Sequence, residues 1–114
     1  MPRIVSLADY RQPPKRVFFS RRELNLLLSL YSRRVMNGEW RDYAIDHYDD
    51  RAVFSIFRHT ADRPVYVVEK TAGRGPDGMI YRLAAGPRPL HQGEALSDII
   101  DTIERRPRLV LTAV

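Results

Sequence analysis

The first third of the chain carries apolar residues at helical spacing. They lie three or four positions apart at Leu24, Leu27, Leu28, Tyr31 and Val35, and Leu26 and Leu30 widen the same stripe. This spacing predicts an amphipathic helix that ends near Met36, because Asn37 and Gly38 supply the left-handed turn that stops helices. Ser20 and Glu23 stand three residues apart before the stripe, which is the pattern of a capping box.

Residues 42–57 alternate between polar and apolar types, which indicates two antiparallel strands with one half-buried face. A two-residue turn at Asp49 and Asp50 places three pairs on the apolar face: His47 with Ala52, Ile45 with Phe54, and Tyr43 with Ile56. Asp42, Ala44 and Asp46 then lie on the other face, opposite Phe57, Ser55 and Val53. Trp40 precedes the hairpin, and we expect it to anchor the core.

The remaining pattern predicts further strands and a second helix. Strands are expected at residues 16–19, 65–70 and 78–83, with a hairpin loop at 71–77. Residues 86–89, Gly-Pro-Arg-Pro, read as a break, after which a helix begins near Gly93 or Glu94 and ends at Pro107. Its apolar side contains Leu96, Ile99, Ile100 and Ile103. Residues 108–111 read either as a last strand or as an ordered tail.

This order of elements, β-α-β-β-β-β-α-(β), predicts the α+β class. We expect one two-layer domain over residues 16–114, in which two helices cover one face of an antiparallel sheet of four to five strands. Residues 1–15 precede it as a basic arm. A length of 114 residues suits one modest core and is too short for two.

Composition narrows the environment of the protein. The chain contains no cysteine, which excludes disulfides, thiol nucleophiles and cysteine zinc sites. It has no apolar run long enough to span a membrane, and its start lacks the features of a secretory signal. We therefore expect a cytoplasmic protein without membrane contact.

The net charge of +5 is concentrated at the N-terminus. Residues 1–22 carry six basic side chains against Asp9 alone, whereas residues 23–114 carry equal numbers of basic and acidic residues. A basic arm on a neutral domain is suited to phosphates or to an acidic protein surface, although a solubilising tail has the same composition. The candidate nucleic-acid-binding residues are Arg3, Arg11, Lys15 and Arg16 in the arm, and Arg33 and Arg34 at the end of the first helix. Arg105 is a further candidate if the folded surface makes the contact.

The acidic residues of the hairpin invite a metal-site hypothesis that the pattern does not support. His47 stands beside Asp46, Asp49 and Asp50, but neighbours on a strand point to alternate sides, whereas metal ligands must converge. The sequence GRGPDG at residues 73–78 resembles a phosphate loop, yet a strand rather than a helix is predicted to follow it. No nucleophile with a base and no paired carboxylates are legible, so we expect no metal, no cofactor and no enzymatic activity.

Two functional classes remain open. The first is a regulatory module that binds nucleic acid through the basic arm. The second is an adaptor or self-associating domain that uses its sheet face or an exposed strand edge. The distribution of charge separates them, because a contiguous positive surface favours nucleic acid and arginines paired with acids favour an adaptor.

The run RVFFSRRELNLLLSLYSRRVMNGEWRDYAIDHYDDRAVFSIFR at residues 16–58 resembles the family called domain of unknown function 2794. The similarity continues through PVYVVEK and more weakly through GMIY and LHQGEALSDII, so it covers most of residues 16–104. The resemblance implies a bacterial, cytosolic protein. It implies no activity, cofactor or site residue.

Overall fold

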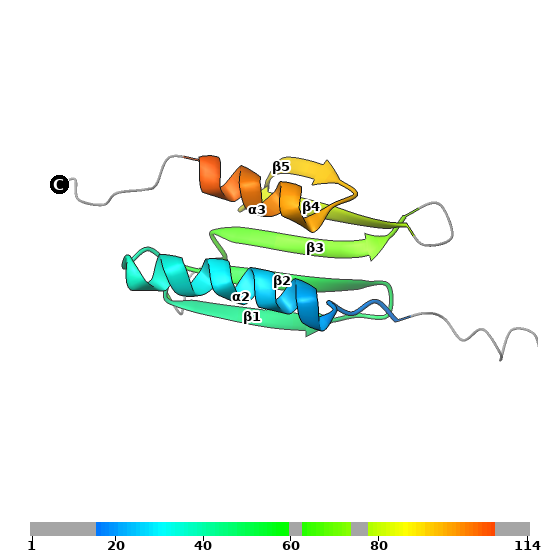
Figure 1. Ribbon diagram of the computed structural model, residues 1–114, viewed down its shortest axis with the longest axis horizontal. Coiled ribbons are helices and arrows are strands. Elements are labelled where there is room, and N and C mark those ends of the chain that lie inside the picture. Colours follow the sequence, from blue (N-terminus) through cyan, green and yellow to red (C-terminus); the bar gives the residue numbers. More distant parts are fainter. Residues whose placement is uncertain (1–15, 60–62, 74–77, 107–114) are drawn as a thin grey trace, which may run out of the picture.

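Two helices and five strands make up the part of the chain that the computed structural model describes, residues 16–59, 63–73 and 78–106 (Figure 1). The helices are α2 (Arg21–Met36) and α3 (Leu96–Arg105), with the labels of Figure 1. The strands are β1 (Asp42–His47), β2 (Arg51–Phe57), β3 (Tyr66–Ala72), β4 (Met79–Ala85) and β5 (Arg88–Gly93).

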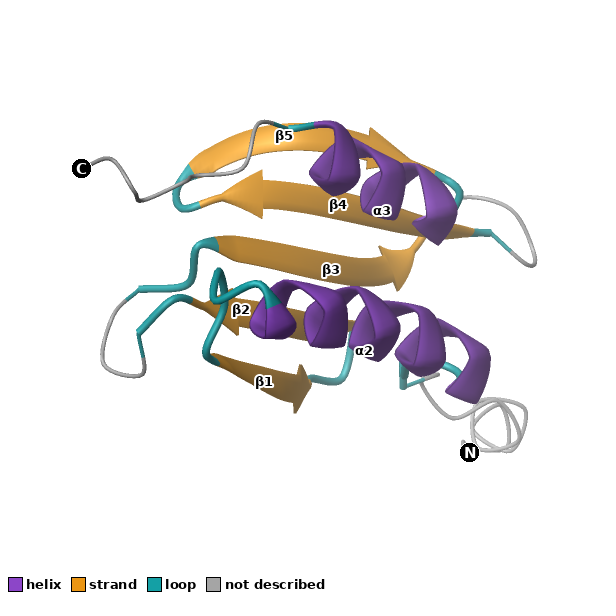
Figure 2. Ribbon diagram, turned by 60° about the vertical axis from the view of Figure 1, so that its left-hand side comes forward, coloured by secondary structure: helices purple, strands orange, loops and turns teal. Residues whose placement is uncertain are grey.

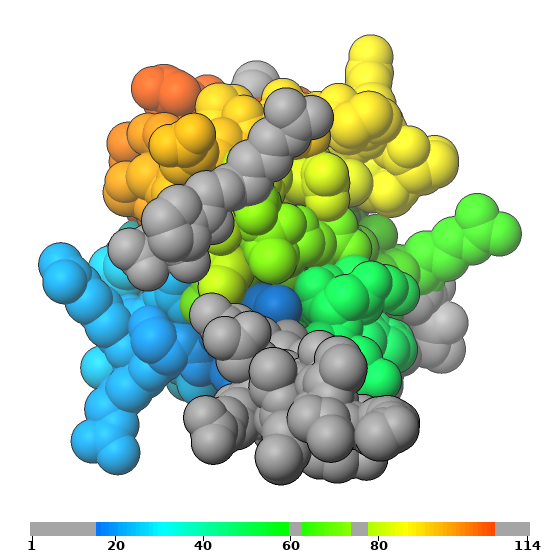
Figure 3. All heavy atoms as spheres, turned by 90° about the vertical axis from the view of Figure 1, so that its right-hand side faces the viewer, coloured from blue at the N-terminus to red at the C-terminus, as the bar shows by residue number. Residues whose placement is uncertain are grey.

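The strands form one antiparallel sheet in the order β1-β2-β3-β4-β5, so each pairs with its neighbour in sequence. Both helices lie on the same face, α2 over β1 and β2 and α3 over β4 and β5 (Figure 2). The end view in Figure 3 shows the helices, in blue and orange, on one side and the strands, in green to yellow, on the other. The predicted two-layer α+β class is confirmed.

The register predicted for the first hairpin is also confirmed. Tyr43 pairs with Ile56, Ile45 with Phe54 and His47 with Ala52. Phe54 and Ile56 have no exposed surface, whereas Tyr43, on the edge strand, remains 38% exposed. Edge strands have one covered side fewer, so the same face is buried less completely at β1 than at β2.

Helix α2 begins with the predicted capping box. The backbone NH of Glu23 donates to Ser20 Oγ over 3.1 Å, and the backbone NH of Ser20 donates to Glu23 Oε1 over 2.8 Å. Most of the predicted apolar stripe is confirmed, since Leu27 and Leu30 are fully buried and Leu24, Leu28 and Tyr31 pack against the core, while Arg34 is an unexpected buried member. Val35 and Leu26, expected on the apolar side, are 38% and 43% exposed.

Residues 16–19, predicted as a strand, are not part of the sheet. They do alternate in burial, with Val17 and Phe19 inside and Phe18 exposed, which is why their sequence resembles a strand. However, the Phe18 carbonyl accepts a hydrogen bond from Lys70 Nζ at 2.7 Å, and Lys70 belongs to the central strand β3. The segment therefore lies over the helix-covered face, where it meets side chains, and not along a sheet edge.

Strand β5 occupies residues where a break was predicted. Gly86 and Pro87 form a two-residue turn between the paired residues Ala85 and Arg88, and Gly86 has the positive φ of 61° that such a turn requires. Pro89 is tolerated because β5 is an edge strand, in which a missing NH need not leave a ladder bond unmade. Helix α3 accordingly begins at Leu96, later than predicted, and has the expected buried residues Leu96, Ile99 and Ile103. Residues 108–111 lie outside the described residues.

The core lies between the sheet and the two helices. Its fully buried side chains come from every layer, and those with the least exposed surface include Val17, Leu27, Leu30, Phe54, Ile56, Val68, Leu83, Ile99 and Ile103. Trp40 is 4% exposed, which confirms its predicted role as an anchor. No helix within the described residues is long and apolar enough to cross a membrane.

Candidate nucleic-acid interface

The structure separates the sequence candidates into different places. Arg3, Arg11 and Lys15 lie outside the described residues. Arg16 is exposed and lies 3.8 Å from Asp49 at the β1–β2 turn, next to the start of α2. Arg33 and Arg34 lie in the last turns of that helix, whose 16 residues span about 24 Å at about 1.5 Å per residue. Arg16 therefore does not share a surface with this pair.

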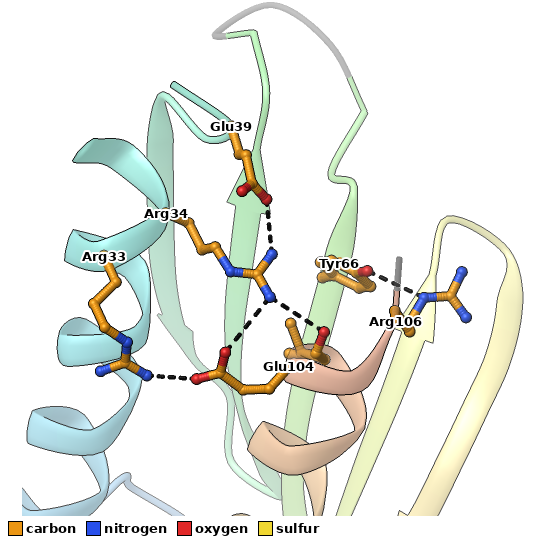
Figure 4. A network of polar contacts seen from close by, with 7 residues as sticks. Arg33, Arg34, Glu39, Tyr66, Glu104 and Arg106 are labelled. Atoms are coloured by element: carbon orange, nitrogen blue, oxygen red, sulfur yellow. Dashed lines mark hydrogen bonds and ion pairs between the residues drawn. The ribbon is translucent and has the colours of Figure 1, made fainter. Parts of the chain in front are cut away.

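Arg34 is a buried structural residue, with only 4% of its surface exposed. Its Nη1 lies 2.8 Å from Glu39 Oε1, and its Nη2 donates to the Ile103 carbonyl over 3.3 Å (Figure 4). The guanidinium also lies 5.2 Å from the centre of the Trp40 ring, within the range of a cation–π contact. Arg34 thus joins α2 to the segment before β1 and to the end of α3, and it is not placed to reach a phosphate.

Arg33 is exposed but paired with an acid. Its Nη2 lies 2.6 Å from Glu104 Oε2, while Glu104 Oε1 is 3.7 Å from Arg34 Nη2. The hydrogen bond from Arg33 lowers the pKa of Glu104, and the nearby charges of both arginines outweigh the opposing effect of burial. Both helix C-termini are held together by this network.

Five other arginines gather at one end of the sheet. We call this surface the arginine-rich end, and it consists of Arg41, Arg58, Arg63, Arg88 and Arg105. None of the five forms an ion pair with another described residue. Arg58 is half-buried and the other four are exposed. Five guanidinium groups without an ion-pair partner among the described residues therefore lie at this end of the sheet.

Strand pairing is what brings these arginines together. Arg41 donates its backbone NH to the Phe57 carbonyl, so Arg41 and Arg58 flank the same end of the first hairpin. The Val65 NH donates to the Ile56 carbonyl there, which places Arg63 at this end of β3. Arg88 opens β5 opposite Ala85, and Ala84 pairs with Val67 at the start of β3. In an antiparallel sheet of this order, every second connection lies at the same end. The β2–β3 and β4–β5 connections therefore share the end at which β1 begins.

Helix α3 contributes Arg105 to the same end. The next residue, Arg106, donates from Nε to the Tyr66 hydroxyl over 3.1 Å, which fixes the C-terminus of α3 beside the start of β3 (Figure 4). The opposite end of the domain carries five acidic residues and four arginines, which nearly balance: Asp46, Asp49, Asp50, Glu94 and Asp98, and Arg16, Arg21, Arg22 and Arg51. The two ends of the sheet therefore differ in charge.

The sequence candidates did not include Arg41, Arg58, Arg63 or Arg88. Arg41 and Arg58 stand one residue outside β1 and β2, Arg63 stands three residues before β3, and Arg88 is the first residue of β5, all places where charged residues are common. A signal was nevertheless present, because an antiparallel meander puts every second connection at the same end. Because β5 was not predicted, the sequence did not indicate at which end of the sheet Arg88 lies.

A second polar cluster joins the first turn of α2 to the middle of the sheet. Lys70 Nζ lies 2.7 Å from Glu23 Oε1, and the Tyr81 hydroxyl donates to Glu23 Oε2. Burial raises the pKa of Glu23, but hydrogen bonds from Lys70, Tyr81 and the Ser20 NH outweigh it, so the pKa lies below its ordinary value. Burial, followed by the bond to Glu23, raises the pKa of Tyr81. These polar atoms bind one another, and the cluster is part of the core.

The acidic residues of the first hairpin are spread over its turn and its uncovered face. Asp49 lies near Arg16, and Asp50 lies 3.2 Å from Arg51. His47 packs against Phe18, with 4.8 Å between the ring centres. Among residues 16–59, 63–73 and 78–106, no three His, Cys, Asp or Glu side chains are grouped so that they could hold a metal ion.

The fold and the charge distribution define an antiparallel α+β domain with arginines concentrated at one end of its sheet. The family model described as "protein of unknown function (DUF2794)" matches residues 17–100, well over half of the chain. The chain belongs to this family, as its sequence resemblance implied. Comparison with curated proteins and with solved structures found no match.

Proposed function

We propose that the protein is a non-enzymatic module that binds nucleic acid through phosphate contacts. The observation that supports this proposal is the arginine-rich end, whose five guanidinium groups have no acidic partner among the described residues. Guanidinium groups suit phosphates because their planar donors bind two oxygens at once. Neutralising the phosphates with these cations also releases counterions from the polyanion, which favours binding at low salt.

The basic arm remains a second proposed contact, with Arg3, Arg11, Lys15 and Arg16 as its residues. Arg16 enters the domain beside the β1–β2 turn, at the end opposite the arginine-rich end. The two sets of residues are therefore separate contributions that can be measured independently. An adaptor that binds an acidic protein surface is the alternative, since the same guanidinium groups bind carboxylates.

The experiment is a titration of a labelled duplex and a labelled single strand, followed by fluorescence anisotropy at several salt concentrations. One variant changes Arg41, Arg58, Arg63 and Arg88 to glutamine, and another changes the four arm residues to glutamine. A control changes Arg21, Arg22 and Arg74 to glutamine, which removes three positive charges from elsewhere in the chain. Four phosphate contacts correspond to a log-log salt slope of about −3 to −4.

We expect the first variant to lose most of the affinity and most of the slope, while the control keeps both. Loss only in the arm variant would assign the contact to the arm and not to the folded domain. Equal losses in all three variants would mean a response to net charge alone. No binding at about 50 mM salt, where phosphate contacts are strong, would favour the adaptor.

A further inference from the structure

No described residue covers the face of the sheet that lies opposite the helices (Figures 2 and 3). Side chains alternate along each strand, so every second residue of all five strands points to this open face. The strand register aligns one row of short side chains across the whole sheet: Ala44, Ser55, Val67, Ala84 and Pro89. Short side chains across five strands leave a shallow trough that permits another flat surface to approach closely.

The neighbouring row on the open face is charged and internally connected. It consists of Asp46, Val53, Glu69, Arg82 and Gln92. Glu69 lies 3.3 Å from both Arg51 and Arg82, and Arg82 donates from Nε to Gln92 over 3.1 Å. These ion pairs and the hydrogen bond hold the long side chains flat along the sheet. The trough beside them therefore stays open.

A hollow of about 550 Å³ lies over β3, β4 and β5, on this same face. Val67, Ala84, Pro89 and Leu90 contribute its apolar lining, and Glu69 and Arg82 lie at its border. The five strands, at about 4.8 Å spacing and about 3.3 Å per residue, form a face of roughly 24 by 20 Å. The flat extent of this face is about 480 Å², somewhat over half of the roughly 800 Å² of accessible surface that each partner buries in a stable interface.

The charges on the open face complement one another across its centre. The half formed by β1 and β2 carries Asp42, Asp46 and Arg51, and the half formed by β4 and β5 carries Arg82. The half formed by β1 and β2 therefore has a net charge of −1, and the half formed by β4 and β5 has a net charge of +1. Glu69 on the central strand lies between Arg51 and Arg82 and neutralises one of these two charges, so the face as a whole carries one excess negative charge.

We propose that this open face is the surface through which two copies of the chain associate. Complementary halves are brought together by a twofold axis that runs over β3, parallel to the strands, because this axis places β1 of one copy over β5 of the other. Asp46 then lies beside Arg82 of the second copy, and the short side chains of the two rows face each other. The result is a four-layer arrangement with the helices outside.

This inference does not rest on the proposed function, but it bears on it. An axis parallel to the strands leaves both copies pointing in the same direction. Both arginine-rich ends then lie side by side at one end of the dimer. An axis perpendicular to the strands would instead place them at opposite ends.

The first test measures the mass of the full chain by light scattering and sedimentation over a range of concentrations. We expect a dimer, and we expect Val67→Lys to raise its dissociation constant by about 100-fold, because the ammonium group would be taken out of water without a partner. The control is Ser29→Lys, which places the same charge on the exposed side of α2. Circular dichroism melts verify that both variants are folded.

The second test uses charge reversal, which distinguishes the proposed pairing from other contacts. In a Glu69→Gln background, which removes the partner of Arg82 within its own chain, Asp46→Arg and Arg82→Asp should each weaken the dimer, because each places like charges side by side. Their combination should restore it, since the pair is then reversed and still opposite in sign. Restoration by the double variant is not expected if the face binds anything other than a second copy in this orientation.

Two results would overturn the proposal. A wild-type chain that is monomeric at every concentration shows that two copies do not associate through this face. A dimer that is weakened by Ser29→Lys and not by Val67→Lys shows that the copies meet through the helices.

Discussion

Lys70 Nζ lies 2.7 Å from Glu23 Oε1, and both side chains are almost fully enclosed, with 10% and 14% of their surfaces exposed. The contact joins the central strand to the first turn of α2. Glu23 performs a second task there, since the same oxygen accepts the backbone NH of Ser20 in the capping box. One carboxylate therefore both starts the helix and attaches it to the sheet.

Breaking this pair should cost more than replacing it. We expect Glu23→Gln to lower the free energy of unfolding by about 3 kcal/mol, because Lys70 is left enclosed without its charge partner. Glu23→Leu combined with Lys70→Met should cost less than the sum of the two single changes, since no unpaired charge remains. Urea denaturation of the four chains measures this coupling. Additive effects would show that the two side chains act independently.

Acid should weaken the fold through the same carboxylate. The pKa of Glu23 is lowered in the folded chain, so its stabilising contribution is fully present above the unfolded value near 4.5 and is lost as the pH falls through the folded value. Glu104, whose pKa is also lowered, acts in the same direction. We expect the melting temperature to fall below about pH 4.5. Glu23→Gln should flatten this part of the curve, whereas an unchanged profile would assign the acid sensitivity to other groups.

Arg34 and Arg33 are adjacent, and their substitution should have very different effects. Arg34→Ala removes the contacts to Glu39, the Ile103 carbonyl and Trp40 from an enclosed site, and should cost about 3 kcal/mol. Arg33→Ala removes an exposed pair with Glu104 and should cost no more than about 1 kcal/mol. Thermal and urea denaturation of the two variants measure the difference. Equal losses would mean that burial of Arg34 does not determine its contribution.

The first hairpin offers a direct measure of the sheet's buried face. Phe54→Ala should lower the free energy of unfolding by about 3 to 5 kcal/mol, as expected for emptying a large core position. Tyr43→Ala, on the same face of the edge strand, should cost less because Tyr43 is 38% exposed. Denaturation in urea gives both values. A cost below about 1 kcal/mol for Phe54→Ala would mean that this side chain is not in the core.

The local patterns of the chain were enough to determine most of the fold. Alternation in residues 42–57 specified the hairpin register, because a shift of one residue would have turned Asp46 inward in place of Ile45. The capping box and the stripe of leucines specified where α2 begins and that it packs on the sheet. These features depend on residues only a few positions apart, so they can be read from the sequence.

Features that depend on distant parts of the chain were decided by the tertiary structure. Residues 16–19 have the alternation of a strand, but Lys70, more than fifty positions away, binds their backbone over the sheet face. Arg34 looked like a surface charge because its partners Glu104 and Ile103 lie on the other helix. The arginine-rich end required all five strands to be placed before its members could be grouped. Charge and hydrogen bonding act across space, and only the folded chain determines which of these groups meet.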